Sequence, residues 1–192
     1  MLRIGILASQ GDFAAHAKMF RSLGAEAREV RTPADFDGLD GLVIPGGEST
    51  TIAKAIERDR LETAISSHAA AGRPLLGTCA GLIICDSEHL GLIDATARRN
   101  AFGRQRQSFE TDLAVEGLGT EPLRAVFIRA PWIEHHGAGV EVLASHDGHP
   151  VVARQDGVLV CAFHPELTDD SRLHALFMAM ASAAHERVEE RA

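Results

Sequence analysis

The sequence has only three cysteines in 192 residues, at positions 79, 85 and 161, and no two of them form a C-x-x-C pair. An odd number of cysteines without that spacing argues against a disulfide framework and against a thiolate zinc site. A reducing compartment is the simpler interpretation. Hydrophobic stretches long enough to cross a membrane are also missing, and no signal-peptide core follows Met1. We therefore predict a cytoplasmic protein that does not contact a membrane.

A basic surface and a nucleotide-binding loop are absent as well. The formal net charge is −8, and no stripe of lysines and arginines alternates with aromatic residues. This balance argues against nucleic acid as a partner. The sequence contains neither G-x-x-x-x-G-K-[ST] nor G-x-G-x-x-G. The histidines at 135, 136, 146 and 149 lack the spacing of a zinc site and are expected to be solvated loop side chains. We expect no cofactor and no metal.

Low-complexity and long polar tracts are lacking too, and hydrophobic residues make up 45% of the chain against 24% charged residues. This composition is typical of a soluble globular protein. A chain of 192 residues can bury one core without disulfides or metals. The sequence shows no internal repeat and no obvious linker. We therefore predict a single domain over residues 1–192.

Short apolar runs alternate with helical patterns in the first half of the chain. Strands are predicted at residues 2–8, 27–30, 42–44 and 74–76, and helices at 13–23, at 50–71 with a break near Asp59, and from Ala80 onwards. This βαβ rhythm predicts a parallel sheet. After Gly91 the pattern favours strands at 125–128, 140–144, 151–153 and 158–163, some of them antiparallel. A closing helix is expected from Asp169 or Asp170 to residue 188.

The most informative motif is Gly-Thr-Cys-Ala-Gly at residues 77–81, which follows one apolar run and precedes another. It is the cysteine form of the G-x-S-x-G nucleophile elbow, in which a strand turns sharply into a helix beneath the nucleophile. Glycines tolerate the crowding of such a turn, and a helix N-terminus favours a thiolate. Cys79 is therefore the candidate nucleophile. Cys85 and Cys161 lie in apolar surroundings and are expected to be core residues.

Two further motifs supply what a cysteine nucleophile needs. Phe-His-Pro-Glu at residues 163–166 offers His164 as a base and Glu166 as its orienting carboxylate, since side chains at i and i+2 of an extended segment lie on one side. Pro-Gly-Gly-Glu-Ser at 45–49 follows an apolar run and predicts a glycine turn whose backbone N–H groups form an oxyanion hole. An open α/β sheet builds its site at such strand ends.

Together these three motifs closely resemble those of the class I, triad-type glutamine amidotransferases. The resemblance extends to the glutaminase subunits of pyridoxal 5'-phosphate synthase, and three segments carry it: Gly-Gly-Glu-Ser-Thr-Thr at 46–51, Arg-Asn-Ala-Phe-Gly-Arg-Gln at 99–105 and Phe-Ile-Arg-Ala-Pro at 127–131. His-Pro-Glu-Leu-Thr at 164–168 belongs to the same pattern. The fold implied is a single-domain, flavodoxin-like, three-layer α/β fold with a mostly parallel central sheet and some antiparallel strands.

The resemblance implies a role for each matching residue. Cys79 is the nucleophile, His164 the base and acid, and Glu166 the residue that orients His164. The amides of Gly47 and Ala80 form the oxyanion hole. Glutamine binding is assigned to six residues: Gly47, Glu48, Ser49, Arg99, Ile128 and Arg129. Simpler interpretations stand beside three of these assignments. Glu48 is also interpreted as a helix N-terminal carboxylate, and Arg99 and Arg129 as surface charges.

The expected activity is hydrolysis of L-glutamine to L-glutamate and ammonia, and the resemblance implies a (β/α)8 barrel synthase subunit as the partner that receives the ammonia. Gln10 matches the family segment that contacts this partner, although Ser9 and Ala15 stand where leucine and glutamate are expected. Three alternatives remain open at this point. They are the glutaminase of imidazole glycerol phosphate synthase, a non-catalytic regulatory subunit, and a stress-type or hydrolytic cysteine protein on the same fold.

Overall fold

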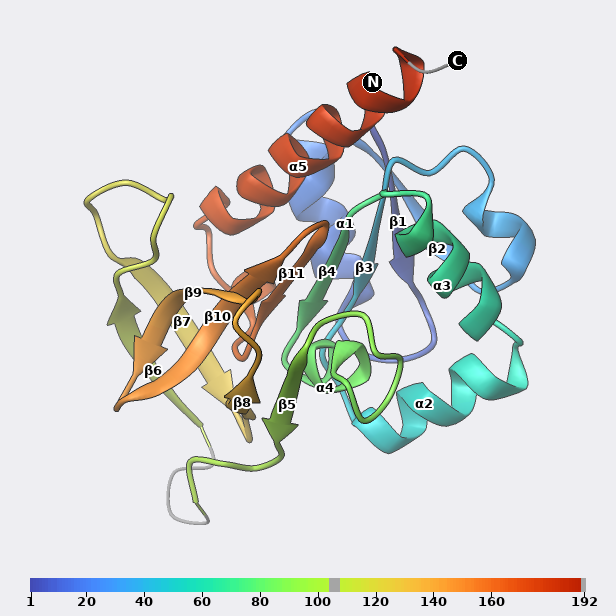
Figure 1. The fold of residues 1–192 in the computed structure, drawn as a ribbon. Helices are drawn as coiled ribbons and strands as arrows, with labels where there is room; N and C mark the ends of the chain where they lie inside the picture. Colours follow the sequence, from blue (N-terminus) through green and yellow to red (C-terminus); the bar gives the residue numbers. More distant parts are fainter. Residues whose placement is uncertain (104–107, 191–192) are drawn as a thin grey trace.

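A seven-stranded sheet forms the centre of the molecule in the computed structural model, which describes residues 1–103 and 108–190 (Figure 1). The strand order is β2-β1-β3-β4-β11-β10-β9. Pairing is parallel from β2 to β11 and antiparallel from β11 to β9. The strands are β1 (Arg3–Leu7), β2 (Glu26–Val30), β3 (Gly41–Ile44), β4 (Leu75–Thr78), β9 (Glu141–His146), β10 (His149–Gln155) and β11 (Val158–Cys161).

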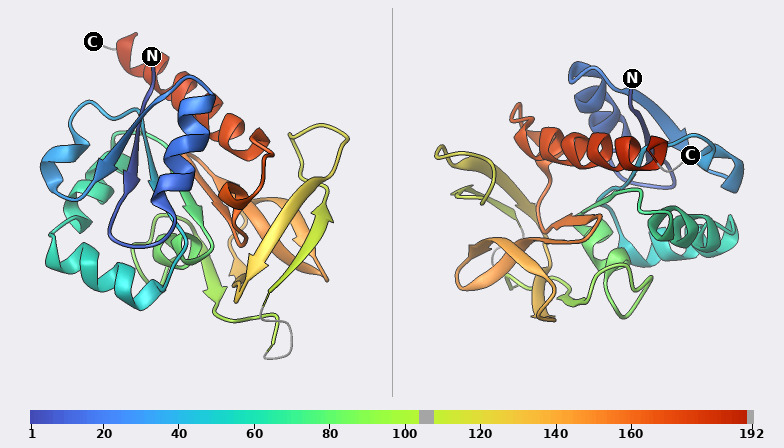
Figure 2. Two further views of the ribbon diagram at one scale, coloured as in Figure 1. Left: turned by 180° about the vertical axis from the view of Figure 1, so that it is seen from behind. Right: turned by 45° about the horizontal axis from the view of Figure 1, so that its top comes forward.

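Helices cover both faces of the parallel part of the sheet, as the two views of Figure 2 show. Helices α1 (Phe13–Ser22) and α5 (Arg172–Glu189) lie on one face, where Phe20 packs against Phe177. Helices α2 (Ser49–Arg58), α3 (Glu62–Ala70) and α4 (Ala80–Cys85) lie on the other. The three layers and the mostly parallel sheet confirm the predicted fold class. None of the described helices is long and apolar enough to span a bilayer.

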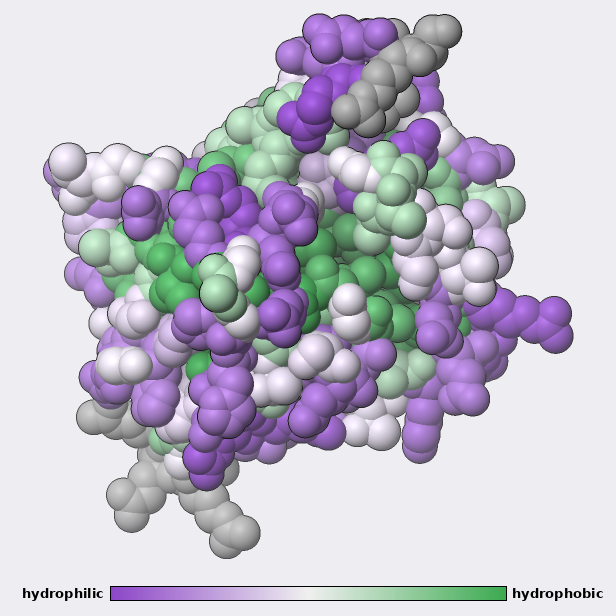
Figure 3. Space-filling model, in the orientation of Figure 1, coloured by the Kyte–Doolittle hydropathy of each residue, from purple (hydrophilic) through white to green (hydrophobic). Residues whose placement is uncertain are grey.

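The central strands of the sheet correspond to the continuous apolar runs of the sequence, because these strands are buried on both faces. All residues of β3, β4 and β11 are buried, which is why each strand is a continuous apolar run and does not alternate with polar residues. In Figure 3, hydrophobic residues gather near the middle of the face, and hydrophilic residues surround them toward its edges. The predicted helical stretch 50–71 is broken as expected, because α2 ends before Asp59 and α3 starts at Glu62.

Several elements are absent from the predicted pattern. Strand β5 (Ala95–Arg98) pairs with β8 (Trp132–His136), and β6 (Ser108–Leu113) pairs with β7 (Leu123–Ile128), the last being the predicted strand 125–128 with two more residues. A 3-10 turn, η1, spans Pro33–Phe36.

The closing helix α5 begins at Arg172, later than predicted, because the Asp170 carboxylate accepts a hydrogen bond from the Arg172 amide at 3.1 Å.

Close packing between α4 and the end of β3 leaves no room for a side chain at Gly81. A Cβ atom built there would lie 1.9 Å from the carbonyl oxygen of Ile44. This contact involves backbone on both sides, so no side-chain rotation relieves it. The first turn of α4 is therefore pressed against the sheet edge where β3 ends.

We predict that Gly81→Ala lowers the free energy of unfolding by about 3 kcal/mol, the upper end of the usual cost of overpacking, because the new methyl group meets a backbone carbonyl. Urea unfolding measures this change. Gly157→Ala is the matched control, since its Cβ would have no neighbour closer than 3.7 Å. Equal stability of the two variants would contradict the close approach of α4 to β3.

Candidate active site

Cys79 occupies the sharp turn between β4 and α4, as the sequence predicts. Its backbone adopts φ 48° and ψ −105°, a conformation that L-residues rarely adopt. The Cys79 amide donates to the carbonyl of Cys161 at 2.8 Å, and the Cys79 carbonyl accepts from Leu82 at 3.1 Å. The turn is therefore fixed by the neighbouring strand β11 on one side and by the first turn of α4 on the other.

His164 and Glu166 lie beside the thiol and form a hydrogen-bonded pair. The Nδ1 of His164 is 2.8 Å from Oε1 of Glu166. The expected extended geometry is wrong, because residues Pro165–Leu167 form a 3-10 turn, η2, directly after His164. Pro165 fixes the backbone angle at the start of this turn, which brings the carboxylate back toward the ring. The predicted contact between His164 and Glu166 is thus present, but a 3-10 turn brings the two side chains together where an extended segment was expected.

The charge state of His164 follows from these contacts. Burial lowers the pKa of the imidazole, but hydrogen bonds with Cys79 and Glu166 outweigh burial and raise it to about 10. The pKa of the Glu166 carboxyl is lowered in spite of its burial, because His164 donates to it and His16 lies nearby. His164 is therefore an imidazolium at neutral pH, held between the Glu166 carboxylate and the Cys79 sulfur.

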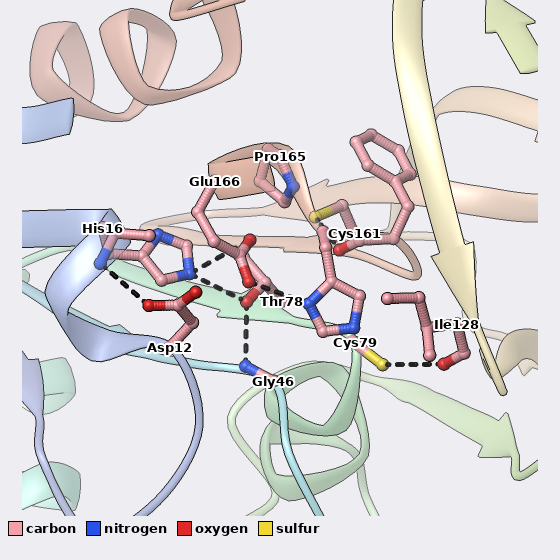
Figure 4. Close-up of polar contacts among 12 residues, drawn as sticks. Asp12, His16, Gly46, Thr78, Cys79, Ile128, Cys161, Pro165 and Glu166 are labelled. Atoms are coloured by element: carbon pink, nitrogen blue, oxygen red, sulfur yellow. Dashed lines mark hydrogen bonds and ion pairs between the residues drawn. The ribbon is translucent and has the colours of Figure 1, made fainter. Parts of the chain in front are cut away.

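The glycine turn after β3 lies directly against these side chains. The Gly46 amide donates to the Thr78 hydroxyl at 3.1 Å (Figure 4). A Cβ atom at Gly46 would lie 2.5 Å from Cε1 of His164 and 3.2 Å from Cβ of Cys79. Gly47 has φ +146°, which favours glycine. Only a residue without a side chain brings the backbone this close to the thiol.

Glu48 and Arg99 form an ion pair at the mouth of the site. The Glu48 carboxylate caps α2 by accepting from the amides of Thr50 and Thr51, and Arg99 Nη2 lies 3.0 Å from its Oε1. Hydrogen bonds from the Thr51 hydroxyl and from these two amides lower the pKa of Glu48 to about 2. The helix-capping interpretation of Glu48 is therefore confirmed, and the same carboxylate also holds Arg99 in place.

A cavity of about 360 Å³ brings the predicted residues together. The Cys79 thiol lies at its wall, 3.9 Å from the carbonyl oxygen of Ile128. Glu166 is not at the wall but is buried behind His164. Predicted residues that line the cavity are Gln10, Gly47, Glu48, Ser49, Cys79, Ala80, Arg99, Ile128, Arg129 and His164.

Sequence reasoning missed several residues at the site. The cavity is also lined by Ile83, Asn100 and Pro131. Asn100 and Pro131 lie within the family-like segments 99–105 and 127–131, so the sequence could have indicated these two. Arg104 and Gln105 of the segment 99–105 lie outside the described residues. Gln10 reaches the cavity with its Oε1 buried and without a hydrogen bond, so its assignment to a partner interface stays a prediction.

The other candidate groups have structural roles. Cys85 and Cys161 are buried as predicted, and burial raises the pKa of Cys85 to about 12. The histidines were expected in loops, and this was wrong, because His135 and His136 lie in β8, His146 in β9 and His149 in β10. His149 stacks on Trp132 with ring centroids 3.6 Å apart. Among the described residues, no group of three or more histidine, cysteine or acidic side chains forms a potential metal site.

Comparison with known proteins identifies the family. The model of the SNO glutamine amidotransferase family matches residues 6–183. The chain belongs to this family. Proteins named pyridoxal 5'-phosphate synthase subunit PdxT are similar along nearly the whole chain. The protein from Niallia circulans is 48% identical over 95% of this chain and 100% of its own length. That from Mycobacteroides abscessus is 49% identical over 94% of this chain and 97% of its own.

Solved structures agree with this assignment. The crystal structure of a glutamine amidotransferase superposes with a TM-score of 0.89 at 46% identity, covering 93% of this chain and 98% of that one. The structure of PurLQS from Thermotoga maritima has the same fold. It superposes with a TM-score of 0.75 at 16% identity, covering 93% of this chain and 98% of that one. The fold is therefore that of the glutamine amidotransferases.

The backbone at Cys79 predicts an unusual order of stability. We expect Cys79→Gly to be more stable than Cys79→Ala by about 1 kcal/mol. Glycine relieves a backbone strain of about 1–3 kcal/mol, and part of this gain is offset because glycine loses more conformational freedom on folding than alanine. Thermal or urea unfolding of the two variants measures the difference. At Cys161, which lies at the end of β11, the alanine variant is expected to be the more stable one. If the alanine variant were the more stable one at position 79 as well, the backbone at Cys79 would be unstrained.

Proposed function

We propose that this chain is the glutaminase subunit of a pyridoxal 5'-phosphate synthase, hydrolysing L-glutamine to L-glutamate and ammonia. Membership of the glutamine amidotransferase family and identity of 48% to PdxT proteins over almost their full length support this function. The observation that carries the chemistry is the placement of His164 beside Cys79 in one cavity, with its Nδ1 2.8 Å from the buried Glu166 carboxylate. A cysteine, an acid and a nearby glycine turn are what amide cleavage requires.

The first half of the reaction forms a thioester. The Cys79 thiolate attacks the side-chain carbonyl carbon of glutamine, and the oxyanion accepts hydrogen bonds from the amides of Gly47 and Ala80, each worth about 2.7–4 kcal/mol of barrier. His164 transfers its proton to the leaving nitrogen. The carbon–nitrogen bond breaks and ammonia departs, which leaves a γ-glutamyl thioester on Cys79 and a neutral His164.

The second half releases glutamate. His164, now neutral, removes a proton from water, and the hydroxide attacks the thioester carbon. The carbon–sulfur bond breaks, the thiolate of Cys79 is restored beside an imidazolium, and the new γ-carboxyl group loses its proton to solvent as glutamate leaves. Glu166 keeps its charge throughout and holds the ring by the 2.8 Å contact. Burial of Glu166 keeps water away from this hydrogen bond.

The mouth of the cavity suits the charged end of an amino acid. Glutamine carries a carboxylate and an ammonium group there, and the cavity offers Arg99 and Arg129 as cations with Glu48 as an anion. Ser49 and Ile128 line the remaining wall. With the head group at Arg99, the carboxamide points inward toward Cys79, which is the orientation that hydrolysis needs.

Ammonia produced in this cavity needs a second protein to use it, since free ammonia is lost to protonation and diffusion. The PdxT relatives are named as subunits of a synthase. We propose that the partner of this chain is a synthase subunit with a (β/α)8 barrel, that it docks beside Gln10, and that the complex is cytoplasmic.

Glutamate release from glutamine is expected to rise when the purified chain is mixed with the pyridoxal 5'-phosphate synthase subunit of the same organism. Cys79→Ala should abolish release but still bind that subunit, because the thiol is required for chemistry and is buried. Coupled glutamate dehydrogenase and analytical ultracentrifugation measure the two properties. Turnover by Cys79→Ala would contradict the triad. Rescue of a histidine auxotroph instead of a vitamin B6 auxotroph would favour imidazole glycerol phosphate synthase.

Arg99→Met is expected to raise KM for glutamine about tenfold or more with a smaller change in kcat, because it removes a cation from the mouth of the cavity but leaves the triad intact. Steady-state kinetics measures both constants. Arg98→Met is the matched control, since Arg98 faces Glu134 and the Trp132 ring. An unchanged KM in the Arg99 variant would remove Arg99 from the substrate site.

A further inference from the structure

A chain of buried polar groups continues from the triad into the helical layer formed by α1 and α5. Nε2 of His16 lies 3.3 Å from Oε2 of Glu166 and 3.3 Å from Oγ1 of Thr78 (Figure 4). Its Nδ1 lies 3.0 Å from Nε2 of His174. His16, Thr78 and His174 are all fully buried. Nothing in the glutaminase reaction described above uses His16 or His174.

The position of His16 is set by the start of α1. Asp12 caps this helix by accepting from the Ala15 amide at 3.1 Å, and the His16 amide faces the Asp12 carbonyl at 3.3 Å. The ring is therefore carried by the first turn of a helix that packs against β1. On its other side, His174 packs edge-to-face against Phe20 of the same helix, with ring centroids 5.0 Å apart.

The contacts decide where the protons lie. Nδ1 of His174 is buried without a partner, so a proton there would be a buried donor without an acceptor, which is costly. The proton of neutral His174 therefore sits on Nε2 and is donated to Nδ1 of His16. That leaves the proton of neutral His16 on Nε2, which faces the Glu166 carboxylate. The opposite arrangement would turn a nitrogen lone pair toward a carboxylate oxygen.

We propose that His16 is a positioning residue for the triad, directing its Nε2–H at Oε2 of Glu166 and at the Thr78 hydroxyl so that the carboxylate stays fixed behind His164. This inference rests on the proposed function, because it takes Glu166 as the group that orients His164. Oε2 of Glu166 is buried and has no aligned hydrogen bond in this conformation, so His16 is the donor that faces it. The shared Thr78 hydroxyl also accepts from the Gly46 amide, which connects the carboxylate to the glycine turn.

Several titratable groups face this network from the surrounding elements. His164 precedes η2 and donates to Oε1 of Glu166, Cys161 of β11 interacts with the same carboxylate, and His174 comes from α5. Asp12 and Glu166 favour the charged form of His16, but burial outweighs both and lowers its pKa. His16 is therefore a neutral donor, and we expect its loss to raise the pKa of Glu166, because an N–H group that faces a buried carboxylate favours the charged form.

The test compares two substitutions at His16. His16→Gln keeps an N–H donor at about the position of Nε2, whereas His16→Leu keeps volume and removes the donor. His68→Leu is the matched control, because His68 is also buried but lies in α3 against Phe36, away from the triad. Each variant is assayed as the full chain with the synthase subunit, and its folding is checked by thermal unfolding.

We expect His16→Leu to lose about tenfold in kcat/KM and to move the acidic limb of the pH profile upward by about one pH unit, because a buried carboxylate without its donor is protonated at higher pH. His16→Gln should restore both. His68→Leu should lower stability and leave the profile unchanged. A pH profile for His16→Leu that matches the wild type would overturn the proposal.

A second readout does not depend on turnover. The pH dependence of Cys79 alkylation by iodoacetamide, followed by mass spectrometry, reports the state of the thiol and His164 even in a chain without glutaminase activity. Cys85 and Cys161 are fully buried and serve as internal references. A shifted alkylation profile in His16→Leu but not in His68→Leu supports the proposal. Absence of glutamate release by the wild-type complex would instead count against the proposed function. Unchanged alkylation in His16→Leu would count against the role of His16 alone.

Discussion

The left-handed backbone at Cys79 is the constraint on which the other parts of the site depend. A residue with φ 48° directly after a buried strand directs its side chain out of the sheet edge and starts a helix in the next residue. The reversal leaves so little space that Gly77 and Gly81 lie against each other, a Cβ at Gly77 being 2.7 Å from the Gly81 carbonyl oxygen. The thiol is thus presented by backbone geometry, and the groups that act on it must reach it from neighbouring strands.

Those neighbouring strands deliver their groups through sheet register. Ile44 of β3 pairs with Gly77 of β4, and Cys161 of β11 pairs with Thr78. The chain segments that follow these paired residues therefore leave the sheet together, carrying the glycine turn, the thiol and His164. Both faces of β4 are buried and closely packed, so a slip of one residue would turn each side chain to the opposite face, where its neighbours do not fit it. The hydrophobic core therefore fixes the alignment of Cys79, His164 and the glycine turn.

The sequence allowed prediction of most of this arrangement for a physical reason. Buried parallel strands are continuous apolar runs, so β1, β3, β4 and β11 were recognisable, and the motifs at their ends identified Cys79 and His164. Strands β5 and β6 are mostly exposed or half-exposed and contain polar residues, so they form no continuous apolar run. The 3-10 turn at Pro165 could not be separated from an extended segment by spacing alone. His16 had no motif, because its contacts lie 62 residues away at Thr78 and 158 residues away at His174.

The charges of the site divide into a buried group and an exposed one, and this division matches the roles that we propose for them. Glu166 and His16 are shielded from water, so small changes in their contacts act strongly on His164. Glu48 and Arg99 are about half exposed, so their pair is screened and each side chain remains accessible to a charged ligand. A substrate head group can therefore exchange at the mouth without disturbing the buried carboxylate. In the proposed reaction, the sheet and the helices behind it hold the reacting groups. The substrate head group is bound at the ends of β5 and β7 and at the turn after β3, where Arg99, Arg129 and Glu48 lie.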